Sequence, residues 1–211
     1  MLENVVRRIA NTQITFGTSG NASERSSESV PSCWITPSGV AWPHIEPSDF
    51  VRLAIASGEI LSGTLKPSSE WRAHLSIYGA HSWVGGIVHL HSPYATILST
   101  IGSPIRAVHY QMARVADEVP LVPYQTFGSP ELAEVLAGAI SLRVRAVLAE
   151  NHGLFVVGET VEEAYHSAEE VEWTAMIQYH AMAVATPRVL TPAQLNSVRN
   201  AFGDYGQRPL T

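Results

Sequence analysis

The chain has little with which to form cross-links, cross a bilayer or attract nucleic acid. It contains one cysteine, Cys33, so no disulfide can form within it, and the apolar neighbours Trp34 and Ile35 predict a buried strand residue. No stretch approaches the ~20 apolar residues that span a bilayer, and residues 1–14 contain no signal-peptide core. Lys and Arg number 13 against 19 Asp and Glu, so the net charge of −6 offers nucleic acid no general attraction. We therefore expect a cytoplasmic protein that binds neither membranes nor nucleic acid.

Length and composition indicate one globular domain. Charged residues make up 15% of the 211 residues and hydrophobic residues 45%, which suffices for one sizeable core. No linker, repeat or low-complexity tract divides the sequence. Helical and short strand patterns alternate, which predicts a single α/β domain over residues 1–211 with a sheet covered by helices. The direction of the strands does not follow from the pattern.

The spacing of apolar residues and the positions of turn formers predict the individual elements. Residues 16–25 are rich in Gly, Ser, Thr and Asn and are expected to form a turn region. Thr160 and Glu163 predict a capping box that opens the longest helix. The pattern predicts helices over residues 2–14, 69–78, 92–98, 129–142 and 160–184, and strands over residues 32–36, 86–89, 105–109, 119–122, 146–149 and 154–157.

Two histidines end one of the predicted strands. His89 and His91 follow Gly86-Ile87-Val88, and since alternate side chains of a strand share a face, both imidazoles would point into the same space. A third histidine returns in Asn151-His152-Gly153. Imidazole is a favoured ligand of zinc and its first-row neighbours, and catalytic zinc sites use three protein ligands. The three histidines are therefore candidate ligands, although among nine histidines one such pair can also arise by chance.

Three turns in the first 70 residues share small and hydroxyl-bearing side chains. They are Gly17-Thr18-Ser19-Gly20-Asn21, Thr36-Pro37-Ser38-Gly39 and Pro67-Ser68-Ser69-Glu70. Exposed backbone N–H groups at such turns, together with hydroxyls, suit a phosphate group. Each turn alone is explained as well by an ordinary turn or helix cap. Three of them in a chain that also has a candidate metal cluster favour a phosphate site.

Glu70 directly follows the paired serines and has two interpretations. It is either a first-turn glutamate favoured by the helix dipole or a carboxylate close to a metal. In the second case it could ligate the cation or accept a proton, because a metal that polarises a carbonyl acidifies the adjacent C–H group.

The ordered set of motifs resembles the class II aldolase/adducin family, and the resemblance covers almost the whole chain. To the three turns and the histidines it adds Ser92-Pro93-Tyr94-Ala95-Thr96, His109-Tyr110 and Pro123-Tyr124-x-Thr126-Phe127-Gly128. The resemblance implies a central mixed or antiparallel sheet covered by helices. It also implies a zinc-dependent aldehyde-lyase that cleaves a ketose 1-phosphate to dihydroxyacetone phosphate and an aldehyde through a metal-stabilised enediolate.

The resemblance also assigns residues to roles. It implies Zn²⁺ or another divalent metal on His89, His91 and His152, with Glu70 as both ligand and general base. Tyr110 would come from a neighbouring subunit of a homotetramer, and Tyr205 from a mobile tail over about residues 203–211. The phosphate and aldehyde would contact Gly20, Asn21, Ser38, Gly39, Ser68, Ser69 and Phe127. From the residues alone, both tyrosines read as packing or interface residues.

Several activities within the resemblance remain open. Pentulose-phosphate 4-epimerases carry aspartate after the paired serines, so Glu70 favours aldol cleavage. Dehydratases and decarboxylases of the family share the fold. Adducin-like binding modules lack the metal histidines, so the presence of the three histidines argues against that class. Residues 111–118 have no glycine pair where the fuculose-phosphate aldolase branch has one, and residues 24–30 are unusual. Because of these two departures, the resemblance does not determine which aldehyde the enzyme would release. The substrate could be L-fuculose 1-phosphate or a 5-deoxy- or 5-methylthio-ribulose 1-phosphate.

Overall fold

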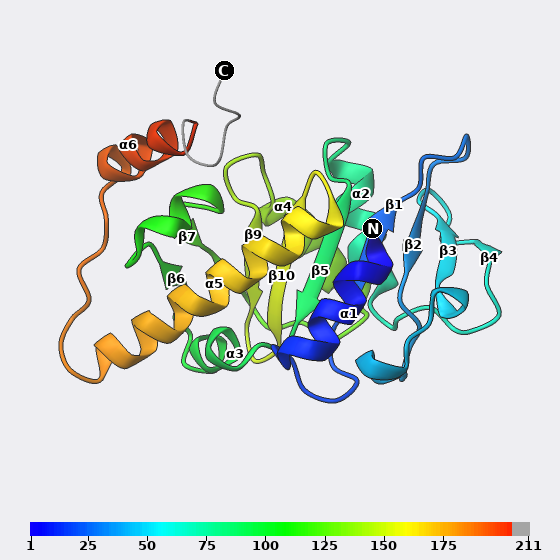
Figure 1. The fold of residues 1–211 in the computed structure, drawn as a ribbon, viewed down its shortest axis with the longest axis horizontal. Coiled ribbons are helices and arrows are strands. Elements are labelled where there is room, and N and C mark those ends of the chain that lie inside the picture. The colour runs from blue at the N-terminus through cyan, green and yellow to red at the C-terminus, as the bar shows by residue number, and fades with distance from the viewer. Residues whose placement is uncertain (204–211) are drawn as a thin grey trace, which may run out of the picture.

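A twisted sheet forms the centre of the computed structural model, which describes residues 1–203 (Figure 1). Within those residues one sheet has eight strands in the order β4-β3-β2-β1-β5-β10-β9-β8, and all its pairs are antiparallel except β8–β9. The mixed sheet agrees with the expected fold class. Its strands are β1 (Asn21–Arg25), β2 (Ser32–Ile35), β3 (Val51–Ala54), β4 (Ile60–Ser62), β5 (Gly86–Leu90), β8 (Leu121–Val122), β9 (Ala146–Ala149) and β10 (Gly153–Gly158).

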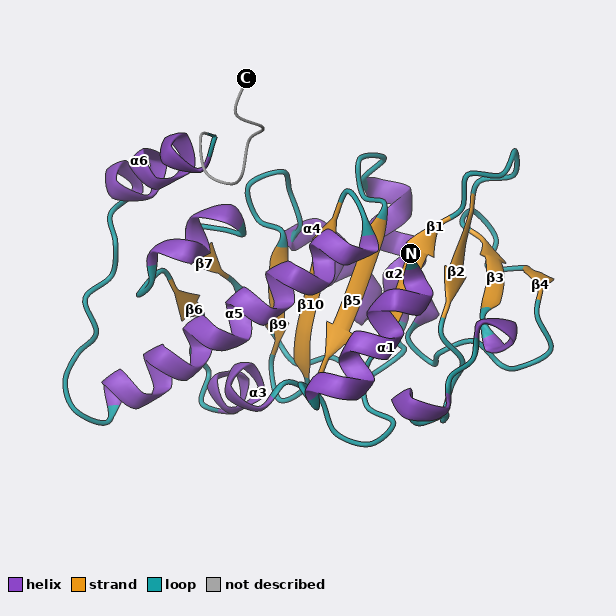
Figure 2. Cartoon of the chain, viewed as in Figure 1, coloured by secondary structure: helices purple, strands orange, loops and turns teal. Residues whose placement is uncertain are grey.

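Helices cover both faces of this sheet, with α1 and α5 in front and α4 behind in Figure 2. One core cluster joins the sheet to α1, α3 and α5, and a second joins it to α2 and α4. Strands β6 (Ile105–Arg106) and β7 (Glu118–Val119) pair separately. The helices are α1 (Leu2–Thr12), α2 (Trp71–Ala80), α3 (Pro93–Thr100), α4 (Pro130–Ala139), α5 (Val161–Met182) and α6 (Pro192–Phe202), with short 3₁₀ turns at Trp42–His44, Pro47–Asp49 and Tyr110–Arg114.

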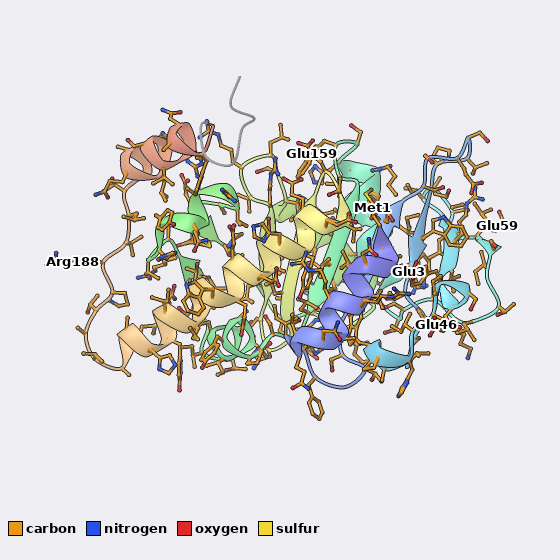
Figure 3. The ribbon with its side chains drawn as sticks, in the orientation of Figure 1. Met1, Glu3, Glu46, Glu59, Glu159 and Arg188 are labelled. Atoms are coloured by element: carbon orange, nitrogen blue, oxygen red, sulfur yellow. The ribbon has the colours of Figure 1, made fainter. Side chains whose placement is uncertain are left out.

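The central strands are buried on both faces, which explains their near-continuous apolar runs. In β10, Leu154 and Val156 belong to the α5 side of the core while Phe155 and Val157 belong to the α2 side. The exposed charged side chains labelled in Figure 3, such as Glu59, lie at the periphery. None of the described helices combines the length and apolarity that a membrane span requires.

Several sequence-based expectations were wrong in detail. The strand expected over residues 105–109 covers only Ile105–Arg106, and the one expected over residues 119–122 is divided between β7 and β8, which belong to different sheets. Residues 21–25, expected to be part of a turn region, form strand β1 between β2 and β5 in the middle of the sheet. The capping box of α5 is only half formed: the Thr160 hydroxyl accepts from the Glu163 N–H, but the Glu163 carboxylate accepts from the N–H of Glu159. Arg145 also pairs with Glu163, at 2.5 Å, and draws that carboxylate away from the cap.

Candidate active site

His89 lies in the centre of the sheet, in one row with residues of both neighbouring strands. Asn21 of β1 and Phe155 of β10 are its direct cross-strand partners, so the three side chains share the face covered by α2. The imidazole stacks on the Phe155 ring, with centroids 3.9 Å apart. Its Nδ1 lies 3.0 Å from the carbonyl oxygen of Leu154, which can only accept. When His89 binds a cation, its proton therefore stays on Nδ1 and Nε2 supplies the lone pair.

The other two histidines meet His89 at the strand ends. His91 follows β5 directly, and its backbone N–H donates to the Thr15 hydroxyl. His152 lies in the turn between β9 and β10, where Asn151 adopts a left-handed conformation with φ of 52°. The ring centroids are 4.9 Å apart for His89–His91 and for His89–His152, and 5.1 Å apart for His91–His152. His152 thus forms a triangle with two histidines that lie more than 60 positions earlier in the chain.

Glu70 completes this group from the N-cap position of α2. Its side chain is buried, with Oε2 2.9 Å from Nε2 of His89 and Oε1 3.2 Å from Nε2 of His152. Burial opposes ionisation, but the charges and hydrogen bonds of His89 and His152 outweigh it and hold the pKa of Glu70 well below its ordinary value. The carboxyl group is therefore a carboxylate at neutral pH.

The donor set fits a divalent transition metal. One ligand atom from each of Glu70, His89, His91 and His152 lies within 4.8 Å of the others. Nε2 of His89 faces Nε2 of His91 at 3.0 Å. Burial, reinforced by its two histidine neighbours, lowers the pKa of His91 to about 4, so its imidazole is neutral at pH 7 as a ligand must be. Three imidazoles and a carboxylate suit zinc or a similar ion.

Two glycines allow the backbone to approach this group closely. A Cβ on Gly153 would lie 2.7 Å from the Leu90 oxygen and 3.0 Å from the His91 ring. Gly20 has φ of +84°, and a Cβ there would lie 2.4 Å from the His89 carbonyl oxygen. Any side chain at either position would displace the strand that carries the histidine pair.

A cavity of about 190 Å³ adjoins the cluster, and residues of the three small-residue turns line it together with Glu70, His91 and His152. The N–H of Ser38 donates to the Lys66 oxygen and the N–H of Ser68 to the Thr36 oxygen, which ties two of the turns together. Hydroxyl groups and backbone N–H groups of such turns are donors suited to an anion. The lining residues are Thr18, Ser19, Gly20, Asn21, Pro37, Ser38, Gly39, Ser68, Ser69, Glu70, His91, Phe127 and His152.

The cavity thus brings together most of the predicted site residues, with His89 beneath it, but not the two tyrosines. Phe127 lines the opening and is 65% exposed. Tyr110 is 49% exposed and contacts the rings of His109 and Phe202 rather than the cavity. Tyr205 lies outside the described residues.

Glu172 of α5 was not predicted from the sequence, yet it holds the start of helix α3, which follows the histidine pair. Its carboxylate accepts the backbone N–H groups of Tyr94 at 2.7 Å and Ala95 at 2.9 Å, so it caps the start of α3. Burial raises the pKa of Glu172, and these donors partly offset the rise. Since α3 begins two residues after His91, this cap anchors the end of the ligand strand. Nothing in the sequence around Glu172, in the middle of α5, indicates this contact.

A mixed sheet that carries three histidines and a carboxylate in one cluster, beside a cavity lined by hydroxyl-bearing turns, is the arrangement of a metal-dependent enzyme. The profile of the "Class II Aldolase and Adducin N-terminal domain" matches residues 2–179. The chain belongs to the class II aldolase and adducin family.

Individual relatives cover nearly the whole chain. It is 34% identical to the 5-deoxy-D-ribulose 1-phosphate aldolase of Bacillus thuringiensis serovar kurstaki over 96% of this chain and 93% of the relative. It is 34% identical to the 5-methylthioribulose-1-phosphate/5-deoxyribulose-1-phosphate aldolase of Rhodospirillum rubrum over 97% and 90%. A solved structure of an L-fuculose 1-phosphate aldolase superposes with a TM-score of 0.89 at 35% identity, over 96% of this chain and 94% of the other.

Proposed function

We propose that this class II aldolase cleaves the C3–C4 bond of a ketose 1-phosphate, L-fuculose 1-phosphate or a similar sugar, to dihydroxyacetone phosphate and an aldehyde. One observation carries the proposal: Glu70 belongs both to the cluster with the three imidazoles and to the lining of the cavity formed by the hydroxyl-bearing turns. A cluster suited to a metal and a set of donors suited to an anion in one cavity fit a substrate that carries both a carbonyl and a phosphate.

In this proposal His89, His91 and His152 hold Zn²⁺ or another divalent cation, with Glu70 as a further ligand. Such an ion, when bound, supplies Lewis-acid polarisation of a carbonyl. The backbone of the Gly20-Asn21 turn and the turns at Ser38-Gly39 and Ser68-Ser69 bind the phosphate and thereby fix the position of C3, while the Asn21 amide is engaged by Glu70 and His74.

Glu70 transfers the proton at C3. During cleavage, the C4 hydroxyl gives up its proton as the aldehyde forms, with Tyr110 as the proposed acceptor, and the electrons of the C3–C4 bond remain on C3. Glu70, once it has taken up a proton, delivers it to C3 to give dihydroxyacetone phosphate, so the net transfer is from the C4 hydroxyl to C3. In the synthetic direction the same carboxylate removes the proton. The depressed pKa of Glu70 keeps it in the basic form before each synthetic turnover. Phe127 packs against the aldehyde fragment.

A 5-deoxy- or 5-methylthio-ribulose 1-phosphate is the second candidate substrate. The similarity to the Bacillus thuringiensis and Rhodospirillum rubrum enzymes supports it. These sugars would release acetaldehyde or methylthioacetaldehyde, whereas L-fuculose 1-phosphate would release lactaldehyde. The exposed ring of Phe127 at the cavity mouth suits an apolar fragment of this kind.

A panel of these three ketose 1-phosphates tests the proposal, with release of dihydroxyacetone phosphate followed by a coupled dehydrogenase. We expect one sugar to exceed the others in kcat/KM, and a chelator to abolish the activity until zinc is returned. Epimerisation without release of dihydroxyacetone phosphate would refute aldol cleavage. A protein with no stoichiometric metal and no turnover would instead be a binding module.

We further propose a cytoplasmic homotetramer in which Tyr110 reaches the cavity of a neighbouring copy. Tyr110 is half exposed and lies away from its own cavity, so a catalytic role requires a second chain. Mixing inactive Tyr110→Phe and Glu70→Gln proteins after dissociation should restore part of the activity, because some mixed interfaces contain both intact residues. Light scattering would report the mass of the assembly, and a monomeric active enzyme would contradict this arrangement.

A further inference from the structure

A buried row of polar side chains runs from Glu70 into the protein between strand β1 and helix α2. On β1, Asn21 and Ser23 are two positions apart and face α2; on α2, His74 and Tyr78 follow Glu70 at four-residue steps. Two strand residues span about 6.6 Å and four helical residues about 6 Å, so the two rows stay in step. Each strand side chain therefore lies between two helix side chains.

Four hydrogen bonds connect the row. Tyr78 Oη lies 2.9 Å from Ser23 Oγ, and Ser23 Oγ lies 2.6 Å from His74 Nδ1. His74 Nε2 lies 2.6 Å from Asn21 Oδ1, and Asn21 Nδ2 lies 3.0 Å from Glu70 Oε2. All five residues are at most 5% exposed, so water does not compete for these groups.

The chemistry of the groups permits only one direction for the protons. The Glu70 carboxylate accepts, so Asn21 must turn its amide nitrogen toward Glu70 and its carbonyl oxygen toward His74. His74 must then donate from Nε2, and its bare Nδ1 accepts from the Ser23 hydroxyl, which in turn accepts from Tyr78. Burial, with the nearby charge of His89, lowers the pKa of His74 to about 3, in keeping with a neutral imidazole.

We propose that His74 is a positioning residue that acts through Asn21 to hold the Glu70 carboxylate in the orientation required for proton transfer at C3. The inference rests on the proposed function of Glu70. Asn21 would otherwise be free to rotate its amide, and its carbonyl oxygen would then repel the carboxylate. The chain Tyr78–Ser23–His74–Asn21 removes that alternative, because reversing any member leaves two acceptors or two donors facing each other.

The test follows the exchange of the C3 proton of dihydroxyacetone phosphate in D₂O by NMR, with zinc-loaded enzyme. His74→Leu should lower the exchange rate at saturation roughly 10- to 100-fold, since a small displacement of a base is costly, and leave the half-saturating concentration unchanged. His74→Gln should recover much of the rate, because its amide N–H can reach Asn21. Tyr78→Phe, at the far end, should change the rate less than about 3-fold.

His81→Gln is the matched control, because His81 ends the same helix and bonds to the carbonyl oxygen of Ala137, away from Glu70. It should exchange at the wild-type rate. A His74→Leu variant that loses affinity for dihydroxyacetone phosphate but keeps its rate would overturn the proposal. So would a Gln variant that is as slow as the Leu variant.

A second measurement needs no activity. In the metal-free protein, long-range ¹H–¹⁵N spectra should show His74 protonated at Nε2 and bare at Nδ1, and Glu70→Gln should shift that Nε2–H resonance. A proton on Nδ1 would reverse the chain and overturn the proposal. If the wild type exchanged no proton while His74 had the expected tautomer, the proposed function would fall and the positioning of Glu70 by His74 would stand.

Discussion

Acid should destabilise the wild-type protein more than a His74→Gln variant. His74 is fully buried, and its folded pKa of about 3 lies below the value of about 6.5 expected in the unfolded chain. Between these two pH values the His74 side chain therefore binds a proton in the unfolded state but not in the folded state. The contribution of the neutral His74 side chain to the free energy of unfolding is complete above about pH 6.5. It is lost as the pH falls toward 3, at up to about 1.4 kcal/mol per pH unit.

Between pH 7.5 and 4.5 this amounts to about 3 kcal/mol, a large part of the 5–15 kcal/mol typical of a domain. Urea unfolding followed by tryptophan fluorescence, with chelator and at one protein concentration, would measure it. The difference in unfolding free energy between wild type and His74→Gln should shrink by about that amount at pH 4.5. Glu70 and His91 titrate in both proteins, so their contributions largely cancel. His81→Gln should track the wild type, and parallel pH curves for wild type and His74→Gln would refute the buried neutral imidazole.

Three further predictions concern the metal group and the base. Gly153→Ala should weaken zinc binding about 10- to 100-fold by pushing on the rings of His89 and His91, whereas Gly138→Ala, whose Cβ meets nothing, should not; titration with a competing chelator measures both. His152→Ala should lower the zinc content per chain by elemental analysis, and an unchanged ratio would remove it from the ligand set. Glu70→Gln should retain the fold but slow C3 proton exchange about 10²- to 10⁴-fold, and near-normal exchange would exclude it as the base.

The sequence predicted the long elements well and missed β1 for a physical reason. Helix α5 and strands β5, β9 and β10 carry clear apolar patterns. In β1 the side chains facing α2 are Asn21 and Ser23, which are buried but polar because they bond to His74 and Glu70. A strand whose buried face is polar does not show the alternation on which strand prediction depends.

The candidate site was predictable as a set of residues but not as a geometry. His89 and His91 could be placed on one face from their spacing alone, whereas the approach of His152 depends on the turn at Asn151 and on Gly153. Tyr110 could not be placed at all, because its proposed partner is another chain. Glu172 reaches the site only through the packing of α5 on α3, which local sequence does not encode.

Hydrogen bonding of β5 on both sides has a consequence for how the protein handles its metal. His89 sits in the part of the sheet with backbone partners on either edge, so its ring is held in place before any ion arrives. A zinc finger unfolds when its metal is removed. This chain should instead keep its fold and its metal pocket without the ion, and should bind the ion again without refolding. In a cell where the supply of the proposed metal ion fluctuates, the protein would remain folded but inactive until the ion became available again.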